Sequence, residues 1–233
     1  AALPWLYLKG ISTGDMREAL TVLVGDQAKG LSPNVVSRLK AEWATEYSAW
    51  MKRNLSTRRY VYWWADGIHT GLRQEKDARQ CLLVIIGVTE HGRKELVAVE
   101  DGYRESEASW LELLLGLRER GLTISPKLAI GDGALGFWKA LHDVFPQTRE
   151  QRCWFHKLGN VLAALPKSAH PNAKKALAEI HQAEDKDHAI AAAKVFAAEY
   201  GAKWPKAAAK ITDDLDVLLA LRERGIEVTV VDV

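Results

Sequence analysis

The sequence predicts a mixed α/β fold, with a β-sheet in the middle of the chain and helices before and after it. Between residues 60 and 154, short apolar segments rich in β-branched and aromatic residues end at Gly and Asp, which is typical of buried strands followed by turns. Elsewhere, apolar residues recur every three to four positions, which is typical of amphipathic helices. The hydrophobic fraction of 48% is sufficient for a core of ordinary size in a chain of 233 residues.

Residues 1–59 are predicted to be helical. A first helix is capped at Ser12-Thr13 and ends near Leu23, and a second helix begins at Ser32-Pro33. The second helix carries apolar residues at helical spacing, namely Val35, Val36, Leu39, Trp43, Tyr47 and Trp50. Two helices around a glycine-containing turn resemble a helix-turn-helix, whose second helix enters the major groove of DNA. A plain helical hairpin is the alternative interpretation.

Five strands are predicted in residues 60–157. They are expected at Tyr60–Ala65, Cys81–Val88, Glu95–Val99, Lys127–Ile130 and Thr148–Trp154. Helices are expected at Ser106–Gly121, at Leu135–Val144 and after the last strand. Three leading strands followed by alternating helices and strands is the order of the ribonuclease H-like fold, a mixed sheet with helices on both faces.

Residues 158–220 are rich in alanine and predict a separate helical part. Three helices are expected there, at Ala173–Ala183, Ala189–Tyr200 and Lys206–Ala220. The tail, residues 221–233, predicts a short helix and one strand at Val228–Val231. The chain is therefore expected to have four parts, with boundaries at 1–59, 60–157, 158–220 and 221–233.

Charge is unevenly distributed along the chain, although the net charge is only +2. Residues 1–59 carry +4, residues 60–140 carry −2, residues 141–210 carry +4 and residues 211–233 carry −4. An acidic centre between basic flanks is typical of an enzyme that binds a polyanion beside a carboxylate-lined metal site. It also occurs in proteins that bind no nucleic acid.

The cysteine content and the hydropathy indicate in which cellular compartment the chain is expected. Cys81 and Cys153 are too few for a disulfide framework, so a reducing cytoplasm is expected. No apolar run reaches the roughly 18 residues that span a bilayer, so no membrane partner is expected. The first residue is Ala1 rather than Met, and the chain is expected to be part of a longer protein.

Two aspartates at strand ends are candidate metal ligands. Asp66 follows the strand at Tyr60–Ala65, and Asp132 follows the strand at Lys127–Ile130 after one glycine. Mg²⁺ prefers carboxylate oxygens, and two such ions roughly 3.5–4 Å apart activate the attacking oxygen and stabilise the leaving oxygen in phosphoryl transfer. The pair predicts a two-metal site. Because Asp-Gly is also a common turn, two ordinary turns are the alternative.

Side chains around these aspartates suggest contacts with nucleic acid. A basic cluster precedes the first strand and consists of Lys52, Arg53, Arg58 and Arg59. Its side chains are expected to contact DNA phosphates, with a solvated linker as the alternative. Trp138 and Trp154 lie near the predicted site and are candidates to stack on a base, although most tryptophans of the chain are expected in the core.

A Cys-x-x-His pair follows the fifth predicted strand. Cys153 and His156 have the spacing of two zinc ligands. A structural zinc site needs further ligands, for which His142 and His170 are the nearby candidates. A buried cysteine beside a hydrogen-bonded histidine is the alternative.

Seven segments closely resemble bacterial insertion-sequence transposases of the Mutator-like family. They are LPWLYLKGISTGD, RRYVYWWADG, CLLVIIGV, GRKELVAVEDGYRES, WLELLLGLRERGL, GDGALGFWKAL and QRCWFHKLGNVL. The resemblance extends from about Leu3 to Ala220.

The resemblance implies a function that the spacing of residues does not establish. Members of this family are DDE transposases with a ribonuclease H-like core and a helical insertion before the last acidic residue. Asp66 and Asp132 are then the first two catalytic acids and bind Mg²⁺ or Mn²⁺, and Cys153 and His156 shape the active site. The implied partners are the terminal inverted repeats of an insertion element and target DNA. These are expected to be bound by a homo-oligomer at the bacterial nucleoid in the cytoplasm.

One family feature has no match in this chain. Family members continue into an Asn-Pro-Ile-Glu segment that carries the third acidic residue, whereas this sequence ends in LRERGIEVTVVDV. Neither Glu223 nor Glu227 is assigned as the third acid. The expectation is a transposase truncated at both ends, for phosphodiester hydrolysis and strand transfer. The alternatives are an inactive fragment that only binds DNA, and another ribonuclease H-like nuclease that cuts without joining.

Overall fold

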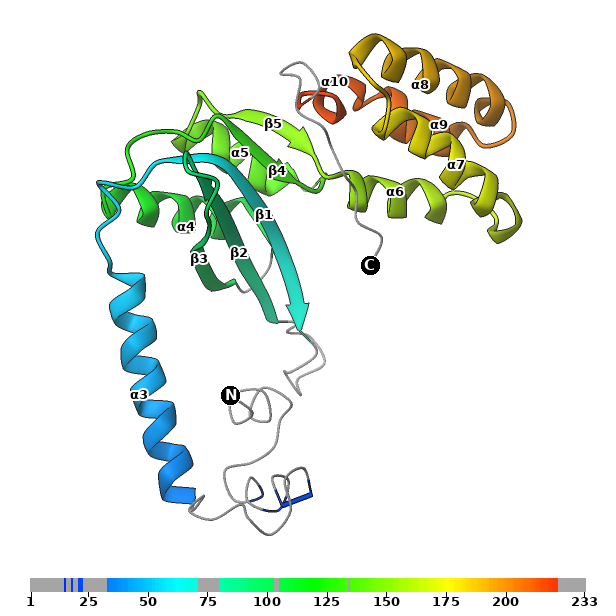
Figure 1. Cartoon of the computed structure of the whole chain (residues 1–233). Coiled ribbons are helices and arrows are strands. Elements are labelled where there is room, and N and C mark those ends of the chain that lie inside the picture. The colour runs from blue at the N-terminus through cyan, green and yellow to red at the C-terminus, as the bar shows by residue number, and fades with distance from the viewer. Residues whose placement is uncertain are drawn as a thin grey trace.

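The computed structural model describes residues 15, 18, 21–22, 33–70, 80–102, 105–133 and 135–221 (Figure 1). The first predicted helix lies largely outside these residues, as do the turn that follows it, Glu223, Glu227 and the predicted tail strand. The helix-turn-helix interpretation therefore stays a prediction.

A five-stranded mixed sheet forms the centre of the described structure. Its strands are β1 (Tyr60–Thr70), β2 (Gln80–Thr89), β3 (Lys94–Gly102), β4 (Leu128–Gly131) and β5 (Arg149–Arg152). The spatial order is β3-β2-β1-β4-β5. β1, β2 and β3 form an antiparallel meander, and β4 and β5 continue it in parallel with β1. The predicted sequence of three strands and then alternating helices and strands is confirmed.

The helices fall into three groups (Figure 1). α3 (Pro33–Met51) precedes the sheet, and α4 (Glu107–Glu119) and α5 (Leu135–Val144) connect its strands. The helical part comprises α6 (Trp154–Ala163), the 3₁₀ turn η2 (Lys167–Ala169), α7 (His170–His181), α8 (Lys186–Gly201), α9 (Pro205–Thr212) and α10 (Leu215–Leu218). The predicted helix at Lys206–Ala220 is two helices, because Asp213 and Asp214 separate them. Short polar side chains of this kind compete for backbone hydrogen bonds.

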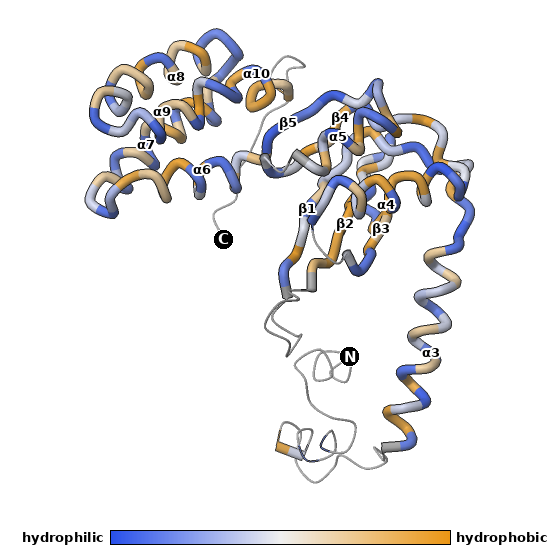
Figure 2. Tube along the Cα trace, turned by 180° about the vertical axis from the view of Figure 1, so that it is seen from behind, coloured by the Kyte–Doolittle hydropathy of each residue, from blue (hydrophilic) through white to orange (hydrophobic). Residues whose placement is uncertain are grey.

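The main core lies between the sheet and the helices α4 and α5, which contact each other. β2 and α4 carry long hydrophobic stretches, whereas α3 is mixed along its length (Figure 2). Two edge-to-face aromatic pairs fill this core: Trp63 with Phe145 at 5.1 Å between ring centroids, and Trp110 with Phe137 at 4.9 Å. α4 begins next to Ser106, close to where it is predicted, and the Ser106 hydroxyl caps it by accepting a hydrogen bond from the backbone N–H of Ser109.

The opposite face of the sheet is covered only in part by the described residues. Leu128 and Ile130 of β4 pack there against Ala220, which follows α10. Along β1, β2 and β3 the same face leaves large apolar side chains partly exposed, namely Trp64, Ile68, Ile86 and Leu96. α4 and α5 therefore cover one face of the sheet, as predicted. Among the described residues, the other face is covered only by the end of the helical part.

α3 extends away from the sheet, and its second half is attached to β3 and α4 (Figure 1). The Tyr47 hydroxyl donates a hydrogen bond to the Val99 carbonyl at 2.6 Å. The Arg120 guanidinium donates to the Met51 carbonyl at 2.7 Å, just after α4. These bonds hold the end of α3 beside the sheet.

The helical part has its own core and is attached to the sheet at β5 and at the neighbouring strand β4. Its core includes Trp154, Phe196 and Tyr200. The Leu218 carbonyl accepts hydrogen bonds from Gln151 Nε2 at 2.8 Å and from Trp154 Nε1 at 3.0 Å. The helical part thus leaves the sheet at β5 and returns to it at β5. In the described part of the chain, no helix has the length and apolar character of a membrane span.

Replacing Gly121 by alanine is expected to lower the free energy of unfolding by about 2–3 kcal/mol. Gly121 has a φ of +93° after α4, and a Cβ there would lie 3.1 Å from the backbone nitrogen of Ser56. Gly92 is the matched control, since its φ is +75° and a Cβ added there would have nothing within 4 Å. Gly92→Ala should cost about 1 kcal/mol. Urea unfolding measures both; equal losses would contradict the close approach at Gly121.

Candidate active site at the end of strand β4

Strand register places Asp66 and Asp132 level with each other. β1 and β4 pair in parallel with Tyr62 opposite Leu128 and Trp64 opposite Ile130. The same offset, continued by two residues, sets Asp66 opposite Asp132. Because side chains alternate along a strand, Asp66 shares the face that carries Trp64, and the same alternation continued past the end of β4 would put Asp132 there as well. The two residues predicted as metal ligands are therefore brought to one end of the parallel pair.

Asp66 does not end its strand, and that detail of the prediction is wrong. β1 runs on to Thr70 because it pairs with β2 along its whole length, up to Thr70 opposite Gln80. Only the parallel pairing with β4 stops near Asp66. Asp66 therefore lies in the middle of a long antiparallel ribbon, with its side chain 52% exposed.

Asp132 follows β4, as predicted, and its backbone is held in place. Trp138 Nε1 donates a hydrogen bond to the Asp132 carbonyl at 2.8 Å. The guanidinium of Arg152 lies over the Trp138 ring at 4.5 Å. A Cβ at Gly131 would approach Trp138 to 3.2 Å, so glycine allows this indole to pack directly under the strand end. This packing holds the backbone of Asp132 in position.

The Cys-x-x-His segment brings a histidine to Asp66. The backbone N–H of Cys153 donates to the Gly131 carbonyl at 2.7 Å, which sets the start of α6 beside Asp132. One helical turn later, His156 Nε2 lies 3.9 Å from Asp66 Oδ1. His156 Nδ1 is buried and makes no hydrogen bond within the described structure. The predicted link between this motif and the active site thus has a geometric basis.

A zinc site that includes Cys153 finds no further ligands. Among the described residues, neither Cys153 nor His156 belongs to a group of three or more potential ligands. His142 Nε2 instead pairs with Glu150 at 3.0 Å, and His170 Nε2 lies 3.2 Å from the Leu165 carbonyl.

The predicted basic cluster divides into one inward and three outward side chains. The Arg53 guanidinium stacks on Trp50 at 3.9 Å and donates to the carbonyls of Leu96 and Val97. Burial lowers the pKa of Arg53, and its role is to fasten α3 to β3. The outward side chains belong to Lys52, Arg58 and Arg59, of which Arg58 pairs with Glu95 at 3.0 Å.

Trp138 and Trp154 are buried at 3% and 4% exposure, so the prediction that they stack on bases is wrong. Both indoles donate hydrogen bonds to backbone carbonyls, which turns their rings inward. Phe155 is an exposed aromatic residue of this region, with 54% exposure, and its ring lies edge-on to His156 at 5.7 Å. A cavity of about 440 Å³ lined by α6 and α7 also reaches His156.

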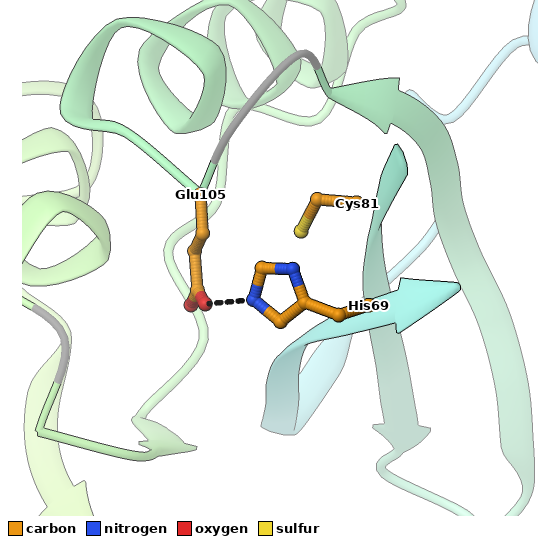
Figure 3. Close-up of side chains that lie close together, drawn as sticks. All are labelled: His69, Cys81 and Glu105. Carbon is orange, nitrogen blue, oxygen red and sulfur yellow. Dashed lines mark ion pairs between the residues drawn. The ribbon is translucent and has the colours of Figure 1, made fainter. Parts of the chain in front are cut away.

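Sequence reasoning missed a cluster formed by His69, Cys81 and Glu105 (Figure 3). His69 and Cys81 are direct partners across β1 and β2, and Glu105 precedes α4. His69 Nε2 lies 3.7 Å from Glu105 Oε2. Burial and the charges of Asp132 and Asp66 raise the pKa of Glu105. Glu105 belongs to GRKELVAVEDGYRES, one of the segments that carry the family resemblance, so the sequence did mark this residue. That His69 lies opposite Cys81 depends on the register of β1 against β2, which neither strand shows by itself.

Comparison with known proteins gives consistent matches along the chain. Residues 2–225 match the family described as Transposase, Mutator family. The chain is 58% identical over 217 residues to the transposase for insertion sequence element IS6120 of Mycolicibacterium smegmatis, covering 93% of this chain and 66% of that protein. It is 53% identical over 212 residues to the transposase for IST2 of Acidithiobacillus ferrooxidans, covering 88% and 69%.

This chain covers a smaller share of a more distant relative. The chain is 28% identical over 220 residues to the transposase for IS256 in transposon Tn4001 of Staphylococcus aureus, covering 93% of this chain and 55% of that protein. The chain thus spans about two thirds of the first two relatives and about half of the third.

Proposed function

The chain belongs to the Mutator family of transposases, and we propose that it is the metal-binding core of a DDE enzyme that cuts and joins DNA. The observation that carries this proposal is the parallel register of β1 and β4, which sets Asp66 level with Asp132 when it is continued two residues past Trp64 and Ile130. Two carboxylates that converge without a cation repel each other, so such a pair favours bound metal. Its oxygens suit Mg²⁺ or Mn²⁺.

The strand order supports a ribonuclease H-like core. β1, β2 and β3 form the antiparallel meander, and β4 and β5 lie beyond β1 in parallel with it. In this arrangement the middle of β1 and the end of β4 meet the start of α6, so two acids and His156 come from three distant segments. We assign residues 60–157 to the catalytic core, 158–220 to the helical insertion, and 1–59 to DNA binding.

The chemistry would be two in-line displacements at phosphorus. In the first, water attacks a phosphodiester at the element end, the P–O3′ bond breaks, and a free 3′-hydroxyl is released. In the second, that 3′-hydroxyl attacks a phosphodiester of target DNA, so that a new P–O3′ bond forms while the P–O3′ bond of the target strand breaks and its 3′-hydroxyl leaves. Two divalent ions, when bound, activate the attacking oxygen and stabilise the leaving oxygen. Asp66 and Asp132 would hold them, together with a third carboxylate that we do not assign to a residue of this chain.

His156 would act as a positioning residue. Its Nε2 faces Asp66 at 3.9 Å, and α6 is fixed to Gly131 through Cys153. From this position the imidazole could donate a hydrogen bond to the Asp66 carboxylate and orient it toward Asp132. Cys153 would contribute through its backbone, which ties the start of the helix to the strand end.

Several exposed side chains are suited to DNA. Lys52, Arg58 and Arg59 would contact phosphates of the terminal inverted repeats or of target DNA. Phe155 would stack on an unpaired base near the cut, because its exposed ring lies beside His156. We further propose that the protein acts as a homo-oligomer on DNA, since joining two element ends requires two active sites.

The decisive experiment uses a labelled DNA fragment that carries the ends of the element encoding this chain. The chain is incubated with it in Mg²⁺, in Mn²⁺ and in EDTA, beside a fragment with shuffled ends. Metal-dependent nicking at the element ends, followed by joining, is the expected result. Cutting without joining would favour a nuclease, binding without cutting would favour a DNA-binding fragment, and the absence of both would overturn the proposal.

A further inference from the structure

The side chains of His69, Cys81 and Glu105 converge from three separate segments (Figure 3). His69 comes from the end of β1, Cys81 from the start of β2, and Glu105 from the residues just before α4. One potential ligand atom of each lies within 4.8 Å of the other two. The Cys81 sulfur and the Glu105 carboxylate both point toward the imidazole ring of His69 (Figure 3).

The chemistry of this cluster differs from that of the aspartate pair. Thiolate and imidazole ligands select borderline metals such as Zn²⁺, whereas Mg²⁺ prefers oxygen alone. In tetrahedral zinc sites, metal–ligand distances of about 2.0–2.3 Å place ligand atoms roughly 3.3–3.6 Å apart. The 3.7 Å between His69 Nε2 and Glu105 Oε2 is already close to that value. The remaining separations need only small side-chain movements.

We propose that His69, Cys81 and Glu105 form a three-ligand site for Zn²⁺, with a fourth position open to water. Binding removes one proton from the Cys81 thiol, which becomes a thiolate, and leaves the imidazole neutral. The three ligands to the metal would be one thiolate, one carboxylate and one neutral imidazole nitrogen. The net charge of the occupied site is therefore zero.

Strand geometry separates this site from the Asp66–Asp132 pair. Side chains at Asp66 and His69 are three positions apart in β1 and so point to opposite faces. Cys81 belongs to the core between the sheet and α4–α5. A Cβ at Gly67 would lie 2.5 Å from Glu105 Oε2, which places this carboxylate against the side of β1 opposite Asp66. The zinc inference therefore does not depend on the proposed DNA chemistry.

A cation here would add a direct link between β1, β2 and the residues before α4. It would link the end of the β1–β2 ribbon to the start of α4, on the core side of the strand that carries Asp66. The charges of Asp132 and Asp66 also reach Glu105, because both raise its pKa. Zinc would neutralise that carboxylate and hold it away from the aspartates.

The test uses the full chain, stripped of metal by a chelator and then titrated with Zn²⁺ or Co²⁺ alone. Bound zinc is counted by elemental analysis after dialysis. Co²⁺ adds a thiolate-to-metal absorption band that reports sulfur ligation directly. We expect one equivalent of metal, the band, and a higher melting temperature with zinc.

Three variants make the result specific. His69→Ala changes a side chain that is 53% exposed, so the fold should persist, and zinc affinity should fall at least about 10-fold. Cys81→Ser should abolish the cobalt band, whereas Cys153→Ser, the matched control, should keep it. Asp132→Asn should keep the cobalt band, because Asp132 is not a ligand of this site. A wild-type chain that binds no zinc, or a band that depends on Cys153, would overturn the inference.

Discussion

Asp132→Asn is expected to lower the rate of DNA strand cleavage at least about 1000-fold, equivalent to about 4 kcal/mol of transition-state stabilisation. Asparagine has the size of aspartate but lacks its negative charge, so it holds a divalent cation poorly. The backbone should be unaffected, because Trp138 contacts the carbonyl of residue 132 rather than its side chain. Asp66→Asn should have the same effect, since Asp66 lies level with Asp132.

Two measurements decide this prediction. Single-turnover cleavage of element-end DNA in Mn²⁺ gives the rate, and Mn²⁺ titration followed by electron paramagnetic resonance gives metal affinity without any DNA. Asp143→Asn is the matched control, because Asp143 is an exposed aspartate on α5. Equal cleavage and equal Mn²⁺ affinity in the wild type and Asp132→Asn would exclude Asp132 as a metal ligand.

Trp110→Ala is expected to lower the free energy of unfolding by about 3–5 kcal/mol. Trp110 is fully buried in α4 and packs edge-to-face on Phe137 of α5 at 4.9 Å. Its removal would leave a large cavity between the two helices that cover one face of the sheet. Closing this cavity would require α4 and α5 to move together, which their connections to β4 resist.

The same substitution at Trp64 serves as the control. Trp64 lies on β1 with 36% of its surface exposed, on the partly uncovered face of the sheet. Trp64→Ala should therefore cost about 1 kcal/mol or less. Chemical denaturation followed by circular dichroism compares the two variants. A loss at Trp110 no larger than that at Trp64 would show that the α4–α5 contact contributes little.

Much of the fold could be predicted because local patterns determine it. The helix at Leu135–Val144 is predicted with its observed bounds, and the start of α3 at Pro33 is also confirmed. α3 begins at a proline, whose fixed φ suits the first turn of a helix. Strand ends were less accurate, because pairing partners determine them. β1 extends past Asp66 to Thr70 since β2 continues beside it, and β5 ends at Arg152 since Trp154 begins α6.

For the candidate site, too, single segments predict the residues but not how those residues come together. Asp66, Asp132 and His156 are predicted from their motifs, but whether the two aspartates lie together depends on the register between strands that are 66 residues apart in the sequence. Burial of Trp138 and Trp154 could not be deduced, because each indole is turned inward by a carbonyl from another segment. The His69–Cys81–Glu105 cluster depends both on the pairing of β1 with β2 and on the position of the residues before α4, and no single segment of the sequence shows either.

The attachment of the helical part to β5 has a consequence for how its length can vary. The segment leaves the sheet at Arg152 and is held again at Leu218 and Leu221, both bonded to Gln151. Its two ends are therefore neighbours in space, like the ends of a closed loop. Doubling such a loop costs only about 0.6 kcal/mol of closure entropy. Helices between α6 and α10 could lengthen or shorten over evolutionary time without displacing the strands that carry Asp66 and Asp132.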